Sequence, residues 1–485
     1  MRNEDDYDDR SGDTTATSAT TAREKALALN LDATSYGTFA EIGGGQEVAR
    51  WFFAVGGAAG TVAKTISAYD MAISDGLYGP AKRYVSRQRL EAMLTQEFDE
   101  LRQRLDARFG ATRCFFAFAD TVATRSFKQP APGGRGWIGI RFQHERRAAE
   151  PSQIIVHAHL PDSTAAREQQ ALGILGVNLI HGAFFHRADP ARLIAALMDG
   201  LSRERVEVDM IKFSGPAFAG VDNRLMTLQL VDRALTDAAM FTADGEVVQP
   251  AEVLYKRPIL VERGSFRPAT KLTLDLLERA LERFLKEPAV RDCKQKPAVL
   301  AEMTLRNLNP QPMTSHDDFL ARADILRTLG FDVLISRFEP YYQLADYLAA
   351  YTEEMIGLAV GLPTLRQVAD ESYYYDLPGG VLESVGRLFK RAVKMYVYPT
   401  RDPQTGQIRT LSNTPPPPPW HHLRNLLVEI GRLEEISASD ESYLSIRTPD
   451  VLARIAADDP SWEGMVPPAV AEIIRAKGLF RTVQS

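Results

Sequence analysis

Residues 319–338 read Phe319-Leu-Ala-Arg-Ala-Asp-Ile-Leu-Arg-Thr-Leu-Gly-Phe-Asp-Val-Leu-Ile-Ser-Arg-Phe338, and this stretch decides the fold class. Phe319, Ala323 and Leu326 recur at three- and four-residue steps, which predicts one face of an amphipathic helix. Gly330 ends that helix, and the apolar segment at 332–338 is typical of a buried strand. A helix that leads directly into a buried strand is the repeating element of a parallel α/β fold.

The same alternation extends along the chain in both directions. Helices are predicted at 86–109, within 165–184 and 190–201, and at 274–285. Strands are predicted at 114–122, 137–142, 154–160, 206–213, 238–242, 259–262, 299–305, 332–338, 356–361 and 393–398. Strands that alternate with helices of about ten or more residues indicate a largely parallel sheet. We therefore predict an α/β fold with a mostly parallel sheet, either barrel-like or doubly wound.

The segments outside the predicted α/β body, residues 111–400, differ from it in composition. Residues 1–35 are acidic and then rich in Thr, Ala and Ser, which predicts a disordered tail. Residues 36–110 are predicted to form a helical region, and residues 421–485 a small helical extension. Residues 401–420 form a proline-rich linker, whose five prolines at 415–419 are either a plain spacer or a ligand for an SH3-like partner.

Charge and cysteine content limit the class of protein. The chain has 485 residues and a net charge of −6, which argues against broad electrostatic binding of nucleic acid. Its two cysteines, Cys114 and Cys293, form neither a disulfide framework nor a metal-ligand spacing. The N-terminus lacks the pattern of a secretory signal, and the apolar runs are too short to span a membrane. We expect a cytoplasmic protein that binds neither nucleic acid nor membranes.

Polar residues follow several predicted strands, and ligands of parallel α/β folds bind at the carboxyl ends of strands. We predict Lys212, Asp120 and Asp244 as catalytic residues on this ground. Lys212 would contact an anion or act as a base, and either aspartate would hold a ribose, a proton or Mg²⁺. The plain alternative is that strands become polar where they leave the core.

A basic segment provides candidate phosphate contacts. Residues 256–271 hold five cations in an otherwise acidic chain, and arginine pairs with phosphate through two parallel hydrogen bonds. We predict that Lys256, Arg263, Ser265 and Arg267, together with Arg337, bind a cofactor or phosphate. A solvated basic patch, balanced by nearby acids, is the competing interpretation.

Motifs for other chemistries are weak or absent. The glycines at 57 and 60, with Lys64 and Thr65, resemble a phosphate-binding loop only superficially, because Ala63 precedes the lysine. His157 and His159 are two apart on a predicted strand and face the same way, and His181 and His186 could add ligands, but the sequence defines no third metal ligand. We therefore assign no metal site. Serine-hydrolase and zinc-protease motifs do not occur.

Four segments carry a family resemblance: Gly44-Gly-Gln-Glu-Val-Ala-Arg50, Val55-Gly-Gly-Ala-Ala-Gly-Thr-Val-Ala-Lys-Thr-Ile-Ser-Ala-Tyr-Asp70, Ile211-Lys-Phe-Ser-Gly-Pro-Ala-Phe218 and Pro460-Ser-Trp-Glu-Gly-Met-Val-Pro-Pro468. Together they resemble a poorly characterised bacterial family over nearly the whole chain. Its members are labelled nicotinate- or nicotinamide-nucleotide adenylyltransferase, or TonB-dependent receptor. The first name implies adenylyl transfer to a mononucleotide. The second implies an outer-membrane barrel, which helices between apolar strands do not fit.

Two functions follow from these patterns. The first is an α/β protein that binds a nucleotide or another phosphorylated metabolite, with Mg²⁺ as a candidate companion ion. The family resemblance implies that such a protein is an adenylyltransferase. Common nucleotidyltransferase signatures are missing, so the resemblance assigns no catalytic residue. The second is a non-catalytic scaffold that forms homo-oligomers through its terminal segments and linker.

Overall fold

The computed structural model describes residues 21–125, 133–308, 316–368, 370, 374, 377–414, 416 and 420–481. The predicted tail at 1–20 and all of the polyproline run except Pro416 lie outside this part. The chain divides into two compact units. The first comprises residues 1–134, 139–151 and 162–206, and the second comprises 135–138, 152–161 and 207–485. Within the described residues, none of the helices combines the length and apolar character that crossing a membrane requires.

The first unit contains a parallel three-strand core. Its elements are α1 (Ala22–Leu31), β1 (Ser35–Gly43), α2 (Val48–Val55), β2 (Val62–Ala68), α3 (Met71–Tyr78), α4 (Arg87–Phe109), β3 (Cys114–Ala123), most of β4 (Gly134–Phe142), α5 (Ala165–Phe185) and α6 (Pro190–Ala196). β1 lies between β2 and β3 and is parallel to both. β1 is therefore buried along nearly its whole length.

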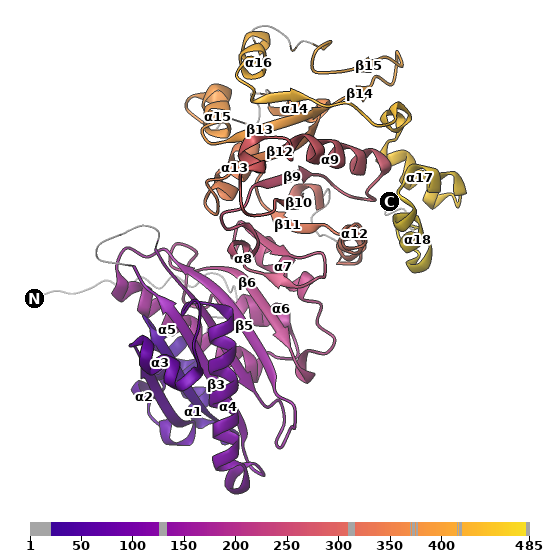
Figure 1. Cartoon of the computed structure of the whole chain (residues 1–485). Coiled ribbons are helices and arrows are strands. Elements are labelled where there is room, and N and C mark those ends of the chain that lie inside the picture. Colours follow the sequence, from indigo (N-terminus) through magenta and orange to yellow (C-terminus); the bar gives the residue numbers. More distant parts are fainter. Residues whose placement is uncertain are drawn as a thin grey trace, which may run out of the picture. The chain divides into compact units, whose positions relative to one another are not determined.

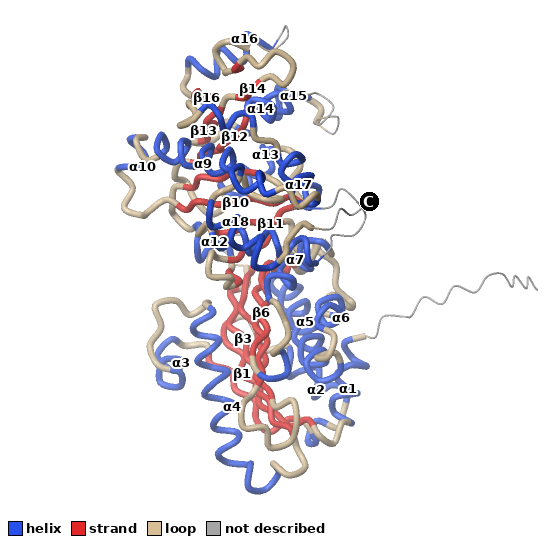
Figure 2. The backbone as a smooth tube through the Cα atoms, turned by 90° about the vertical axis from the view of Figure 1, so that its right-hand side faces the viewer, coloured by secondary structure: helices blue, strands red, loops and turns tan. Residues whose placement is uncertain are grey.

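Helices cover both faces of this parallel core, as Figure 2 shows for α4 on one side and α2 and α5 on the other. On the α4 face, Phe98 and Leu101 pack against Phe115 and Ala117 of β3. On the opposite face, Phe52 of α2 lies 4.9 Å from the ring of Phe39 in β1, and α5 contributes further aromatic contacts. Burial on two faces explains why the strands are apolar runs rather than alternating patterns.

The structure differs from the expectation that residues 36–110 are helical, because β1 and β2 lie within this range. Gly56 and Gly57 have φ values of 84° and 75°, which end α2 and let the chain turn into β2. Part of the expected tail is also ordered. Thr21 and Glu24 form a capping box at the start of α1.

The second unit contains most of the remaining elements. They are β5 (Ser152–Leu160), β6 (Glu207–Ser214), α7 (Asn223–Asp232), β7 (Ala238–Phe241), β8 (Val247–Val248), α8 (Pro250–Leu254), β9 (Ile259–Arg263), α9 (Lys271–Phe284), α10 (Pro288–Arg291), β10 (Ala298–Thr304), α11 (Leu305–Leu308), α12 (His316–Thr328), β11 (Asp332–Ser336), α13 (Tyr341–Ala349), β12 (Ile356–Gly361), α14 (Leu362–Val368), α15 (Gly380–Leu388), β13 (Val393–Tyr398), β14 (Thr400–Arg401), β15 (Ile408–Arg409), α16 (Trp420–Glu429), β16 (Leu433–Glu435), α17 (Thr448–Ala456) and α18 (Pro468–Lys477).

An eight-stranded sheet organises this unit, in the order β16-β13-β12-β9-β10-β11-β7-β8. The six strands from β16 to β11 are parallel, while β7 runs antiparallel to β11. The prediction of a mostly parallel sheet is confirmed. Its two edges, β16 and β8, are different strands, so the sheet is open and is not a closed barrel. The residues expected to form the linker and extension include β14, β15 and β16, and β16 belongs to this sheet.

The helices divide between the two faces of the eight-stranded sheet. α9 packs its Leu277, Ala280 and Phe284 on the face that also holds Leu260 and Ala359. α13 and α15 pack on the opposite face, against Leu358 and Met395 (Figure 1). Figure 1 also shows α9 and α13 close to β9 and β12, the central strands. The unit is therefore doubly wound.

The close approach of α5 and α2 generates the first prediction. A Cβ atom added at Gly176 of α5 would lie 2.4 Å from Cγ2 of Val48 in α2. We expect Gly176→Ala to lower the free energy of unfolding by about 1–3 kcal/mol, because the packed helices must move apart. Gly76→Ala in α3 is the control, since nothing lies within 4 Å of the added atom. It should be neutral or stabilising by about 1 kcal/mol in urea unfolding. Equal effects of both substitutions would contradict the close packing.

Candidate functional site

The order of the parallel strands places the point where the winding of the sheet reverses at the carboxyl ends of β9 and β12. In chain order the six parallel strands are β9, β10, β11, β12, β13 and β16. Across the sheet they lie in the order β11-β10-β9-β12-β13-β16, so the first strand, β9, is followed on one side by the second and third and on the other by the fourth, fifth and sixth. The chain leaves β9 toward β10 and β11, then crosses back to β12 on the other side of β9. Open α/β sheets bind ligands outside the strand ends where the winding reverses in this way. That point lies between β9 and β12, which pair from Ile259–Ile356 to Glu262–Ala359.

The loop after β9 leads into the amino end of α9. It spans residues 264–270, and the backbone N–H of Gly264 donates to the carbonyl of Glu302 at 3.1 Å. The hydroxyl of Thr270 accepts from the backbone N–H of Thr273 and caps the helix. The amino end of a 14-residue helix carries partial positive charge from its exposed backbone N–H groups. The loop and helix end together form a setting suited to an anion.

Arg263, the last residue of β9, is held by a buried carboxylate. Its Nε and Nη2 donate to the two oxygens of Glu302 at 2.8 and 3.0 Å, and Ser336 also donates to Glu302 at 2.6 Å. Its guanidinium lies 4.4 Å from the ring centre of Tyr341. Burial alone would lower the pKa of Arg263, but the negative charge of Glu302 outweighs burial and raises it. Arg263 is therefore a fixed, permanently charged group at the carboxyl end of β9.

Arg267 lies in the loop itself and is more accessible. Its Nε donates to Asp318 at 2.5 Å, and its side chain is 31% exposed. Arg322 of α12 contacts the same carboxylate and also donates from Nη1 to the carbonyl of Ser265 at 3.2 Å. Two guanidinium groups thus share the carboxylate of Asp318. This arrangement ties the loop after β9 to α12.

Glu262 is a buried acid at the carboxyl end of the central strand. It is 6% exposed, and its Oε2 has no hydrogen-bond partner in the described part of the chain. Burial raises the pKa of Glu262 well above its usual range, because the charged form of the carboxyl group loses its hydration. Its partners on the two neighbouring strands are the small residues Ala301 and Ala359. A carboxyl group whose pKa is raised in this way is chemically suited to donate a proton.

The predicted site residues of the second unit do not all gather at one edge. Arg263, Ser265 and Arg267 share one loop, and Arg337 follows β11 at the same carboxyl edge, where it donates to the carbonyl of Val231 at 3.1 Å. Lys256 precedes β9 and therefore lies at the amino edge. This placement corrects the expectation that the whole basic segment converges.

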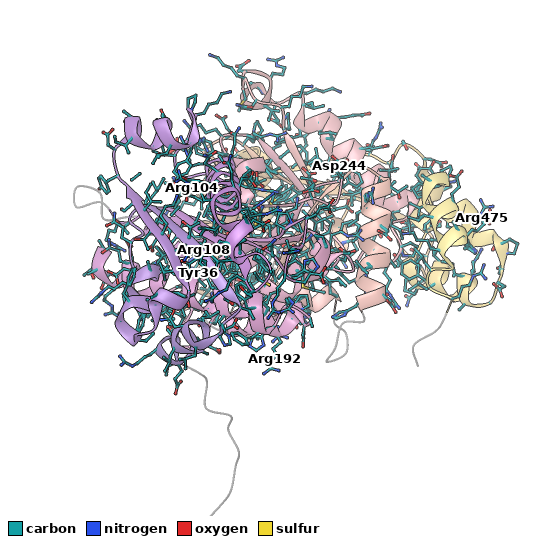
Figure 3. The ribbon with its side chains drawn as sticks, turned by 90° about the horizontal axis from the view of Figure 1, so that it is seen from below. Tyr36, Arg104, Arg108, Arg192, Asp244 and Arg475 are labelled. Carbon is teal, nitrogen blue, oxygen red and sulfur yellow. The ribbon has the colours of Figure 1, made fainter. Side chains whose placement is uncertain are left out.

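Lys212 and Asp244 lie on different elements again. Lys212 of β6 forms an ion pair with Glu246, and Asp244 is exposed in the turn between β7 and β8 (Figure 3). We assumed that each strand would end at a shared edge. β7 runs antiparallel to β11, so its carboxyl end lies at the amino edge of the parallel strands. The two residues share a neighbourhood, since Glu246 is in the same turn region as Asp244.

Asp120, the remaining predicted residue, lies in the first unit at the carboxyl end of β3. It pairs in register with Glu41 of β1, and a Cβ atom at Gly45 would lie 2.2 Å from Asp120 Oδ1. Burial and the neighbouring Glu41 carboxyl group raise the pKa of Asp120 well above its usual range. Both oxygens of Glu41 accept from backbone N–H groups of Val48 and Ala49. This arrangement is a packed acid pair beneath the loop that starts α2.

Sequence reasoning missed Glu262 and Glu302. Both sit inside strands that read as apolar runs, Ile259-Leu-Val-Glu262 and Val299-Leu-Ala-Glu302. An acid within a strand that is buried on both faces was the available signal, because a buried charge must be paired or protonated. The pairing of Arg263 with Glu302 joins neighbouring parallel strands and could not be inferred without their order.

Comparison with known proteins assigns no family. No protein-family model matches the chain, and no curated protein matches it. Similar solved structures include the competence/damage-inducible protein CihA from Agrobacterium tumefaciens, at 16% identity and a TM-score of 0.24 over 33% of this chain and 94% of that one. A CinA superfamily protein from Enterobacter cloacae has 15% identity and a TM-score of 0.23, over 40% of this chain and 99% of its own.

A proposed nicotinate-nucleotide adenylyltransferase from Vibrio parahaemolyticus has 12% identity and a TM-score of 0.20, over 47% of this chain and 97% of its own. Likenesses with TM-scores this low carry no argument about fold or function. The adenylyltransferase resemblance therefore stays a prediction, and these comparisons give the receptor name no support.

The raised pKa of Glu262 predicts a pH dependence of stability. Because this pKa is higher in the folded chain than in the unfolded chain, folding favours the protonated carboxyl group, and the free energy of unfolding falls as pH rises above about 4.3. Glu262→Gln cannot ionise, so its free energy of unfolding should not fall in this way. The free energy of unfolding of the variant minus that of wild type should therefore be larger at about pH 8 than at about pH 5, by ~1 kcal/mol or more. Urea unfolding at both pH values measures this, with exposed Glu278→Gln as control. A pH-independent difference would contradict the assignment.

Proposed function

We propose that the second unit binds a nucleotide or another phosphorylated metabolite in the crevice at the carboxyl ends of β9 and β12. One observation carries this proposal: the loop at 264–270, which holds Arg267 and is flanked by Arg263 and Lys271, follows the strand at which the winding of the sheet reverses. In sheets with this strand order, the loop after the first strand and the helix that follows it bind the phosphate groups of nucleotides.

The contacts assign different roles to the two arginines. Arg267 would bind the phosphate directly, because its guanidinium is accessible and a phosphate can replace Asp318 as its partner. Arg263 is 9% exposed at its side chain and already has a bidentate partner, so it would orient the crevice and supply positive charge. The backbone N–H groups at the start of α9 would complete the anion site.

The reaction class is a narrower proposal. The resemblance favours adenylyl transfer to nicotinate or nicotinamide mononucleotide, with Mg²⁺ as the companion ion of the phosphates. Glu262 is positioned for proton donation at the same strand end as the loop. The predicted catalytic roles of Lys212, Asp120 and Asp244 stay predictions, since these three lie outside the loop and strand ends described above.

A scaffold that assembles into homo-oligomers is the second candidate function. The observation in its favour is a group of exposed apolar side chains at α3: Tyr69, Met71 and Ile73 are 82%, 62% and 59% exposed. Exposed apolar groups of this kind occur at protein interfaces. Light scattering separates the two functions, because a defined assembly that forms equally with and without nucleotides favours the scaffold.

The binding proposal predicts a selective loss in Arg267→Ala. Wild-type protein should be stabilised against heat by at least one member of a panel of nucleotides, dinucleotides and sugar phosphates. Arg267→Ala should weaken the affinity for that ligand roughly 10- to 100-fold, the usual cost of a charge-assisted hydrogen bond. Lys256→Ala is the matched control, because it removes a cation at the opposite edge of the sheet. An equal loss in both variants, or no response to any panel member, rejects the proposed crevice.

A further inference from the structure

A β-bulge in the second unit brings together three side chains that the sequence separates. β5 and β6 pair in antiparallel register, with His157 opposite Met210, Ala158 opposite Val208 and His159 opposite Glu207. The register shifts between His157 and Ala158, so Asp209 is the extra residue on β6. A bulge re-aims side chains at the point where it interrupts the ladder. Here it places the carboxylate of Asp209 against both imidazole rings.

The three groups meet through atoms that ligate metals. Asp209 Oδ1 lies 2.6 Å from His157 Nδ1, and Asp209 Oδ2 lies 3.0 Å from His159 Nε2. One ligand atom from each residue lies within 4.8 Å of the other two. When three ligand atoms each lie about 2.0–2.2 Å from one divalent ion, they are also clustered within a few ångströms of one another. The 2.6 and 3.0 Å separations are hydrogen-bond distances, so the side chains would have to rotate to admit an ion between them.

We propose that His157, His159 and Asp209 form a binding site for a divalent transition-metal ion of the Zn²⁺ or Fe²⁺ class. Two imidazoles and one carboxylate are a donor set that these ions accept, and Mg²⁺ or Ca²⁺ would instead need a shell of oxygen atoms. Three protein ligands leave one or more coordination positions for water or a substrate.

Burial gives the site a closed side and an open side. The side chains of His157 and Asp209 are 4% and 3% exposed, whereas that of His159 is 34% exposed. Two ligands are therefore fixed within the protein, and the third borders solvent. An ion can enter along His159, and a water molecule bound to it would face the same way.

Neighbouring groups orient the ligands, as outer partners do in metal sites. Gln249, the N-cap residue of α8, donates from Nε2 to Asp209 Oδ2 at 3.2 Å. The Trp137 ring lies 4.8 Å from the His157 ring and packs against it. Thr236 donates to Glu207 at 2.7 Å and fixes this acid opposite His159.

The local charge is compatible with a cation. Asp209 and Glu207 carry negative charge on β6 beside the two histidines, and Arg135 of β4 carries a positive charge that acts on His159. The alternative is a hydrogen-bonded triad, in which both imidazoles donate to Asp209 and no ion binds. The two alternatives differ in one measurable property, which is stoichiometric metal binding.

Metal titration of the full-length chain tests the proposal. Protein made without a histidine tag is treated with a chelator, dialysed, and titrated with Zn²⁺ by calorimetry and with Co²⁺ by visible absorption. We expect one ion per chain for wild type. His159→Ala should weaken binding more than about 100-fold, because loss of a ligand exceeds the loss seen when an outer partner is removed.

Matched variants make the result decisive. His422→Ala, at an exposed position of α16, removes a histidine outside the cluster and should bind like wild type. His159→Ala alters the most exposed of the three ligands, and circular dichroism checks that it is folded. Wild type that binds no ion, or folded His159→Ala that binds as tightly as wild type, overturns the site. A loss in His422→Ala equal to that in His159→Ala overturns it as well.

Discussion

The parallel hydrogen-bond ladder that joins β9 to β10 on one side and β12 on the other is the constraint on which the second unit depends. Parallel neighbours cannot be joined by a tight turn, so each connection must cross a face of the sheet, and here helices make these crossings. All parallel strands then end at one edge. Because the winding reverses at β9, the connections that follow β9 and β12 run to opposite sides of that point, which is where sheets of this order bind ligands.

The charged groups at this edge are costly to bury, and the structure offsets that cost in two ways. Arg263 and Glu302 share two hydrogen bonds, which compensate part of the desolvation of both ions. Glu262 has no such partner for Oε2 among the described residues, and burial raises its pKa instead, which favours the neutral form. Arg263 and Glu262 occupy successive positions of β9, so their side chains point to opposite faces of the sheet. One face of the sheet end therefore carries the guanidinium of Arg263, and the other carries the carboxyl group of Glu262.

Strand pairing has a second consequence at β5 and β6, where one extra residue changes which side chains meet. Without the bulge, the regular alternation of the ladder would send Asp209 to the face opposite His157 and His159. With it, a carboxylate and two imidazoles share one face and one set of contacts. The histidine pair was visible in the sequence. The third member was not, because a bulge is a property of two strands and not of one.

Local patterns carried most of the secondary structure: the strands at β3 to β7 and β9 to β13 and the helices α4, α5, α9 and α12 follow from apolar spacing, which depends only on neighbours along the chain. The mostly parallel α/β class follows from their alternation. Strand order, the antiparallel direction of β7 and the bulge at Asp209 arise from contacts between distant segments, so only the folded chain decides them. Arg263, Ser265 and Arg267 lie together because they are close in sequence and share one strand end and loop. Lys256, Lys212 and Asp244 do not join them, because their positions depend on strand direction and strand order.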